Sequence, residues 1–372
     1  MINPRQFSRS YGGRVGIVTL FGRFNYGNRL QNYAVSRIWQ GLGFQPETLV
    51  LERRLNVVHA LKRTAKHILG KPVPLPPESS MSAERLDAFD RFNQIIPIKR
   101  LDSVEPTLAN QYLYFSVGSD QVWNPGMMNR NDEWFFLEFA RPEQRIALAP
   151  SIGLDELGAR EARRIAKGVM GFDHLSVREQ RGAELIKQCS GCDAEVICDP
   201  TLVISSSEWR SVADRGLTPK EPYVFMYLLG GESEDARHMI DVTTDGGRLS
   251  LVSLSDREKP GEPPAGPAEF IDLIDNAEHV ITDSFHAAVF SCLLETPLTI
   301  VRRGGNGGGM FSRLETLAQA LGIESKIYGD TAFDFADAGD YLGVSDRISA
   351  ERDHFMGYLQ PILDEEEGGY GG

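Results

Sequence analysis

The chain has 372 residues, which is more than one hydrophobic core usually covers, so two domains are expected. Its 41% hydrophobic and 24% charged residues are ordinary for a globular protein and exclude a disordered or fibrous chain. The formal net charge of -13 would repel a phosphate backbone, so no nucleic acid is expected as a partner.

No apolar run approaches the ~20 residues that a transmembrane helix needs, and the start, MINPRQFSRS, lacks the apolar core of a signal peptide. We therefore expect a cytoplasmic protein. Residues 53–71 are basic and carry an apolar stripe at helical spacing. This pattern is typical of a helix packed on its own domain, or of one that touches an anionic membrane surface at the inner face.

The four cysteines are too few for a disulfide framework in a chain of this length. Cys189 and Cys192 have C-x-x-C spacing, but no second Cys/His pair completes a zinc site and no thioredoxin-like sequence surrounds them. No metal and no other cofactor is therefore expected.

Strand-like apolar runs alternate with helical patterns, which predicts βαβ units and mostly parallel sheets. The first run, 15–20, leads through a polar loop at 22–28 into a helix whose apolar residues recur at helical spacing up to Gly43. The first half also contains strands at 112–117, 145–150, 175–178 and 195–198 and a helix at 179–188.

The pattern breaks at 206–222 into Ser, Gly, Pro and charged residues, which is typical of an interdomain linker. The segment 346–363 has apolar residues at helical spacing and is expected to pack. An α/β fold is predicted, with two doubly wound domains, 1–205 and 206–372, and a C-terminal helix that can pack back on the first. The second half contains strands at 223–229, 249–254, 279–282 and 297–301 and helices at 233–243 and 269–277.

Ligands of parallel α/β sheets bind at the carboxyl ends of strands, next to helix N-termini. The segment ITDSFHAA at 281–288 follows such a strand, and Asp283 or Ser284 can cap the helix that starts there. His286 lies about 100° from the apolar face and can point into a cleft, where an imidazole transfers protons near neutral pH. A histidine satisfied by packing is the alternative that this segment alone leaves open.

The segment SVGSDQVWNP at 116–125 also places small and polar residues after a strand. Gly118 permits close backbone approach, Ser119 offers a hydroxyl, and Asp120 offers a carboxylate that can accept a sugar proton. A capped turn, with Asp120 as the cap and Trp123 in the core, is the alternative.

The segment RFNYGNRLQNY at 23–33 follows the end of the first strand. Asn25, Asn28 and Gln31 supply amide donors and acceptors suited to hydroxyl-rich ligands, and Tyr26 can stack on a sugar ring. The G-x-G-x-x-G spacing is absent, so NAD binding receives no support.

The segment VRRGGNGGGMFSR at 301–313 joins a strand, a glycine-rich loop and a helix start. Arg302, Arg303 and Arg313 can grip a carboxylate or a phosphate. The segment lacks the G-K-S/T of a P-loop, and a flexible surface loop with solvated arginines is the alternative.

The sequence resembles the polysaccharide pyruvyl transferase family over roughly residues 15–320. The resemblance is carried, in family order, by FNYGNRLQNYAV, FSVGSDQVWNP, WFFLEFA, RIALAPSIG, LSVREQRG, VICDPTLV, HVITDSFHAAVFSCL and FSRLETL. It implies a GT-B-like architecture of two Rossmann-like domains around a cleft. It also implies transfer of pyruvate, as a ketal, from phosphoenolpyruvate to a sugar of a cell-surface polysaccharide or glycan precursor, which can be lipid-linked.

Ketal formation needs an acid, a base and an anion clamp, and the resemblance indicates residues for each. His286 is the expected general acid or phosphate partner, and Asp283 or Asp120 orients groups or accepts the hydroxyl proton. The expected donor-binding residues are Ser284, Arg302, Arg303 and Arg313. The expected acceptor-binding residues are Asn25, Tyr26, Asn28, Gln31 and Ser119.

The chain departs from the family pattern at one position, because the family carries an arginine two residues before the histidine, where this chain has Ser284. The departure leaves room for another donor. A GT-B-type glycosyltransferase using a nucleotide sugar, with a nucleotide pocket in the second domain, is one alternative. A noncatalytic carbohydrate-binding protein that kept the fold is the other.

Overall fold

The computed structural model describes residues 12–52, 77–128, 131–303 and 311–369. The basic segment at 53–71 and the glycine-rich loop at 304–310 lie outside these residues. Within the described ranges, no helix is long and apolar enough to cross a membrane.

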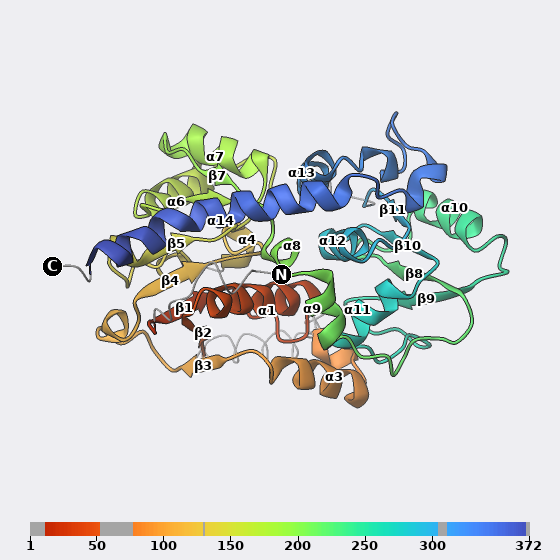
Figure 1. The fold of residues 1–372 in the computed structure, drawn as a ribbon, viewed down its shortest axis with the longest axis horizontal. Helices are drawn as coiled ribbons and strands as arrows, with labels where there is room; N and C mark the ends of the chain where they lie inside the picture. Colours follow the sequence, from red (N-terminus) through yellow and green to blue (C-terminus); the bar gives the residue numbers. More distant parts are fainter. Residues whose placement is uncertain (1–11, 53–76, 129–130, 304–310, 370–372) are drawn as a thin grey trace, which may run out of the picture.

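Five parallel strands form the first sheet in the order β3-β2-β1-β4-β5, on the left of Figure 1. The register places Ile17 opposite Ser116. Because the strands are parallel, their carboxyl ends meet at one edge of the sheet. The strands are β1 (Arg14–Val18), β2 (Gln45–Leu51), β3 (Ile98–Leu101), β4 (Tyr114–Val117) and β5 (Arg145–Ala147).

Four parallel strands form the second sheet in the order β11-β10-β8-β9, on the right of Figure 1. These are β8 (Tyr223–Tyr227), β9 (Ser250–Leu254), β10 (His279–Thr282) and β11 (Leu298–Ile300). A parallel pair, β6 (Ser176–Val177) and β7 (Glu195–Val196), lies next to β5, where Ile146 forms an isolated bridge with His174.

Helices connect and cover the strands. In the first half they are α1 (Tyr26–Gly41), α3 (Ala83–Asn93), α4 (Pro125–Met128), α5 (Asp132–Phe135), α6 (Ala159–Val169), α7 (Gln180–Ser190) and α8 (Pro200–Val203). Then follow α9 (Ser206–Val212), α10 (Glu234–Thr243), α11 (Pro267–Asp275), α12 (Phe285–Leu294), α13 (Ser312–Leu321) and α14 (Val344–Gly369). Short 3-10 turns are η1 (Pro77–Ser80), η2 (Leu108–Gln111), η3 (Pro142–Gln144), η5 (Glu324–Lys326) and η6 (Phe335–Gly339).

The sequences of α1 and α12 show why these two helices form where they do. Asn25 caps α1, because its side-chain oxygen accepts from the Asn28 backbone N at 3.0 Å. Every residue of α12 is buried, which explains why this helix is apolar on all sides.

One hydrophobic core joins the two halves. The Tyr26 ring at the start of α1 stacks on Phe270 of α11, with centroids 4.7 Å apart. The long helix α14 runs across both sheets in Figure 1, below α7 and α13 in this view, and includes Pro361. It contacts α13 and α8, and the Tyr358 hydroxyl donates to the Ala147 carbonyl of β5 at 2.7 Å.

The predicted α/β class is confirmed by the parallel sheets and their connecting helices. The domain boundary between 205 and 206 stays a prediction. The segment expected to be an irregular linker begins instead with α9, because Ser205 caps a helix turn and Trp209 is fully buried against Tyr33 and Phe290.

Candidate active site

The imidazole of His286 lies against the backbone of Gly27. A Cβ atom added to Gly27 would meet His286 Nδ1 at 2.3 Å, so only glycine permits this approach. His286 stands in the first turn of α12, whose start is set by a hydrogen bond of 2.9 Å from Ser284 N to Thr282 Oγ1. The residue keeps 7% of its surface exposed.

Arg178 binds two aspartates of the first half, Asp199 and Asp120, and one of them lies close to His286. Arg178 Nη1 donates to Asp199 Oδ2 at 2.5 Å, and Arg178 Nη2 lies 3.5 Å from Asp120 Oδ1. His286 Nε2 lies 3.9 Å from the same Asp199 oxygen. Burial is the largest single effect on the pKa of Asp199 and acts to raise it, but Arg178, His286 and the hydrogen bonds from Thr201 together outweigh it, and the pKa falls to about 2.

Asp120 is held in a left-handed turn with φ of 65°. Its carboxylate accepts from Asn28 Nδ2 and from Gln121 N. Burial acts to raise its pKa, yet Arg178, then His286 and Arg313, bring the pKa below the ordinary value. Asp120 is therefore ionised at neutral pH.

Arg313 supplies a second buried guanidinium from α13. With the Gln121 amide oriented so that its oxygen faces Arg313, both Nη atoms lie 3.1 Å from that oxygen. Within the described part of the chain, no carboxylate forms a salt bridge with Arg313. Burial lowers its pKa to about 10, with the Arg178 charge acting in the same direction, so Arg313 remains charged at neutral pH.

Several polar atoms of this cluster are buried without a hydrogen-bond partner among the described residues: His286 Nε2, Arg178 Nε, Arg313 Nε and Glu179 Oε2. Such atoms are costly to leave unsatisfied, and several of them in one charged cluster indicate a ligand site. Burial lowers the pKa of His286, and the charges of Asp199 and Asp120, which act to raise it, do not compensate. The imidazole is therefore mainly neutral near pH 7.

Other predicted residues support the site from behind. Gln31 Oε1 accepts from Ser119 N at 3.0 Å, and Ser119 Oγ lies 2.8 Å from the Ala149 carbonyl and 3.0 Å from Asp199 Oδ2. Both side chains are fully buried and positioned toward protein atoms. They hold the Asp120 turn in place, and Asn25, the cap of α1, is partly exposed beside it.

The structure contradicts the expectation for Tyr26. Its ring is 1% exposed because it packs on Phe270 and Phe89, and its hydroxyl donates to the Ala265 carbonyl at 2.7 Å and accepts from Arg85. No face of the ring is left for a sugar.

The other residues predicted on the donor side differ in how close they lie to the His286 cluster. Asp283 uses its carboxylate on Leu229 N and Gly230 N, both at 2.7 Å, and on Arg303 at 3.2 Å, so it fixes a neighbouring loop. Ser284 is buried at the start of α12. Arg302 turns away to Asp330 at 2.7 Å and does not join the cluster.

Sequence reasoning assigned no role to Arg178, Glu179, Asp199 or Gly27. A signal was available for the first two, because two charged residues directly follow the buried strand Ser176–Val177. Glu179 accepts from Ile152 N at 2.9 Å and Gly153 N at 3.1 Å and so holds the loop after β5.

The family model described as polysaccharide pyruvyl transferase matches residues 25–304. No curated protein sequence matches this chain. Among solved structures, a UDP-GlcNAc 2-epimerase from Methanocaldococcus jannaschii is 12% identical, covering 88% of this chain and 98% of its own, with a TM-score of 0.40. The wall teichoic acid polymerase TagF is 10% identical, covering 96% and 90%, with a TM-score of 0.48. At such TM-scores these similarities carry no argument about function.

Proposed function

The chain belongs to the polysaccharide pyruvyl transferase family and is therefore a transferase, and on this premise we propose that it moves pyruvate from phosphoenolpyruvate to a sugar as a ketal. The acceptor is a sugar of a cell-surface polysaccharide or of its precursor, which can be lipid-linked. The cytoplasmic location and the contact with the inner face of the membrane stay predictions.

One observation carries the proposal: His286, Arg178 and Arg313 belong to one charged cluster, and each has a buried nitrogen without a hydrogen-bond partner among the described residues. Phosphoenolpyruvate carries a carboxylate and a phosphate, and guanidinium donors bind both through charge-assisted hydrogen bonds. Arg178 also lies over the Phe285 ring at 4.5 Å, beside Ser284. We propose that Arg178 and Arg313 together supply the anion clamp that the family places partly at position 284.

His286 is suited to the proton transfer that starts the reaction. It is mainly neutral in the free protein, and an anionic donor beside it raises its pKa, so it takes up a proton on donor binding. That proton passes to the methylene carbon of the donor, which becomes the methyl group. The adjacent carbon is left electron-poor, and a first sugar hydroxyl attacks it.

The remaining steps balance without a further reactant. The carbon–oxygen bond to phosphate breaks, and a second hydroxyl of the same sugar attacks the same carbon and closes the ketal. Two hydroxyl protons are released, one replacing the proton lost by His286 and one leaving with phosphate. Asp120, ionised and held by Asn28, is the proposed acceptor of the first proton and passes it on to His286, so Asp120 is ionised again for the next turnover.

The test compares His286→Ala with His238→Ala, a histidine exposed on α10 away from the cluster. Phosphate release from phosphoenolpyruvate with candidate glycans should fall by about 100-fold or more in the first variant and stay unchanged in the second. In parallel, thermal shift compares phosphoenolpyruvate with UDP-sugars, because a ligand stabilises the state it binds. Stabilisation by a UDP-sugar alone, or full turnover by folded His286→Ala, would overturn the proposal.

A further inference from the structure

A separate cavity of about 860 Å³ opens on the first half, beside α5 and α6. This volume lies within the range of about 300–1,000 Å³ that small-molecule sites occupy. None of the residues that line it belongs to the His286 cluster. Its walls come from the segment Asn131–Phe139, from α6, and from Leu51 and Val104 at the ends of β2 and β3.

The cavity lies at the same edge of the first sheet as Asp120, the proposed acceptor of the sugar proton. Leu51 ends β2 and Val104 follows β3, so both mark the carboxyl edge of the first sheet, where Asp120 also lies. The connection that leaves β4 carries Asp120 first and the cavity wall afterwards. Trp123 Nε1 donates to the Phe135 carbonyl at 3.0 Å and ties the two parts of this connection together.

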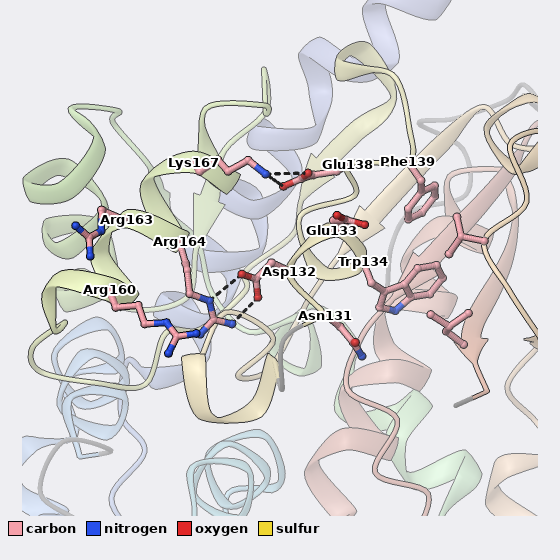
Figure 2. A pocket seen from close by; sticks show the side chains of 12 residues that line it. Asn131, Asp132, Glu133, Trp134, Glu138, Phe139, Arg160, Arg163, Arg164 and Lys167 are labelled. Atoms are coloured by element: carbon pink, nitrogen blue, oxygen red, sulfur yellow. Dashed lines mark hydrogen bonds and ion pairs between the residues drawn. The ribbon is translucent and has the colours of Figure 1, made fainter. Parts of the chain in front are cut away.

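Four cations of α6 line the cavity, and two of them already have partners. Arg164 binds Asp132, with Nε to Oδ2 at 2.7 Å, and Lys167 lies 3.2 Å from Glu138. Arg160 and Arg163 form no hydrogen bond or ion pair with any described residue, and no dashed line joins either of them to another residue drawn in Figure 2. They stand three residues apart on an exposed helix face, where like charges repel each other. An anion between them would relieve this repulsion.

The opposite wall is aromatic. In Figure 2, Trp134 and Phe139 lie across the cavity from Arg160 and Arg163. The two rings stack with centroids 5.1 Å apart and 23° between their planes, and Phe139 is partly exposed. An aromatic surface of this kind packs on the apolar face of a sugar ring.

We propose that this cavity binds an acidic sugar unit of the acceptor glycan, with its carboxylate or phosphate on Arg160 and Arg163 and its ring toward Phe139. The amide of Asn131 and the carboxylate of Glu133, which also line the cavity, serve the hydroxyl groups. The assignment of the ligand as the acceptor rests on the proposed function. On this proposal, the enzyme recognises a charged sugar unit of the glycan that is different from the sugar it modifies.

The experiment measures binding of tetragalacturonate by calorimetry to the full chain, with its methyl ester as a neutral ligand of the same rings. Wild-type protein should bind the acid at least about tenfold more tightly than the ester. The double variant Arg160→Ala/Arg163→Ala should bind the acid and the ester with equal affinity. The control Arg237→Ala/Arg248→Ala removes the same two charges from exposed positions of the second half and should keep the preference for the acid. Galactose 6-phosphate and inorganic phosphate, as competitors, separate a phosphorylated sugar from a bare anion.

Equal binding of acid and ester, or equal loss in both double variants, would overturn the inference. Inorganic phosphate that competes as well as galactose 6-phosphate would overturn the part that concerns the sugar ring. Phosphoenolpyruvate binding is measured separately. If phosphoenolpyruvate binds and tetragalacturonate does not, the inference about the cavity is wrong and the proposed function is kept. If tetragalacturonate binds and phosphoenolpyruvate does not, the inference about the cavity is kept and the proposed donor is wrong.

Discussion

Gly27→Ala is the most direct test of the site, because it adds one methyl group where His286 approaches the backbone of α1. The new Cβ would lie 2.3 Å from His286 Nδ1, whereas ordinary contacts begin at 3.4 Å. The imidazole must therefore move by about 1 Å, and a displacement of about 1 Å at a reacting group costs about 100-fold in rate.

Pyruvyl transfer is followed as phosphate release with an acceptor glycan, and phosphoenolpyruvate affinity is measured by calorimetry. We expect turnover of Gly27→Ala to fall about 100-fold and the affinity for phosphoenolpyruvate to fall about tenfold, since the imidazole of His286, which lies beside the donor, is misplaced.

The matched control is Gly357→Ala, at an exposed helical glycine of α14 with nothing within 4 Å of the added Cβ. It should leave turnover unchanged and stabilise the fold by about 0.5–1 kcal/mol, because alanine suits a helix better. If folded Gly27→Ala turned over and bound phosphoenolpyruvate like the wild type, His286 would not act from this position.

Three further predictions concern charge. Arg313→Gln removes a positive charge that lowers the pKa of His286, so NMR titration should show a higher pKa and calorimetry about tenfold weaker phosphoenolpyruvate binding; an unchanged pKa would contradict this. Asp199→Asn should cost about 3–5 kcal/mol in urea unfolding, because its arginine partner stays buried, against about 0–1 kcal/mol for Glu208→Gln at the surface; similar costs would refute the pair's importance. Burial lowers the pKa of His279 from 6.5 to about 4, so the unfolded chain takes up its proton first and stability falls as pH drops through this window. The loss should reach about 3 kcal/mol at pH 4 and be smaller in His279→Gln; parallel pH profiles would argue against it.

The fold class could be predicted because apolar runs and helical spacing are local signals. The end of α1 near Gly43, the buried strand β8 and the start of α12 follow from such patterns. The start of α1 does not, because Asn25 caps the helix and it begins at Tyr26, inside the loop expected at 22–28. β2 was not predicted, because Pro46 and Glu47 interrupt its apolar run, although the strand lies inside the sheet between β3 and β1. α6 was missed because Ile165 and Val169 are its only buried apolar residues in a charged helix.

The site could be predicted only where a loop follows a strand. This rule led to His286 and Asp120, which the structure brings into one electrostatic cluster. Asp199 was missed because its local sequence is that of a helix cap, a role it also fills for α8. Tyr26 was misjudged because its partners, Arg85 and Phe270, are distant in the chain, and no local pattern distinguishes a buried tyrosine from one that meets a ligand.

The path of α14 has a consequence for how the protein is made. The Tyr114 hydroxyl of β4 donates to the Ile362 carbonyl of this helix, and the Tyr358 hydroxyl of the same helix donates to the Ala147 carbonyl of β5. A ribosome translates both sheets before it translates α14. The strands of the first sheet therefore remain incompletely covered until the second half of the chain has been translated. The two halves complete their folding together rather than one after the other.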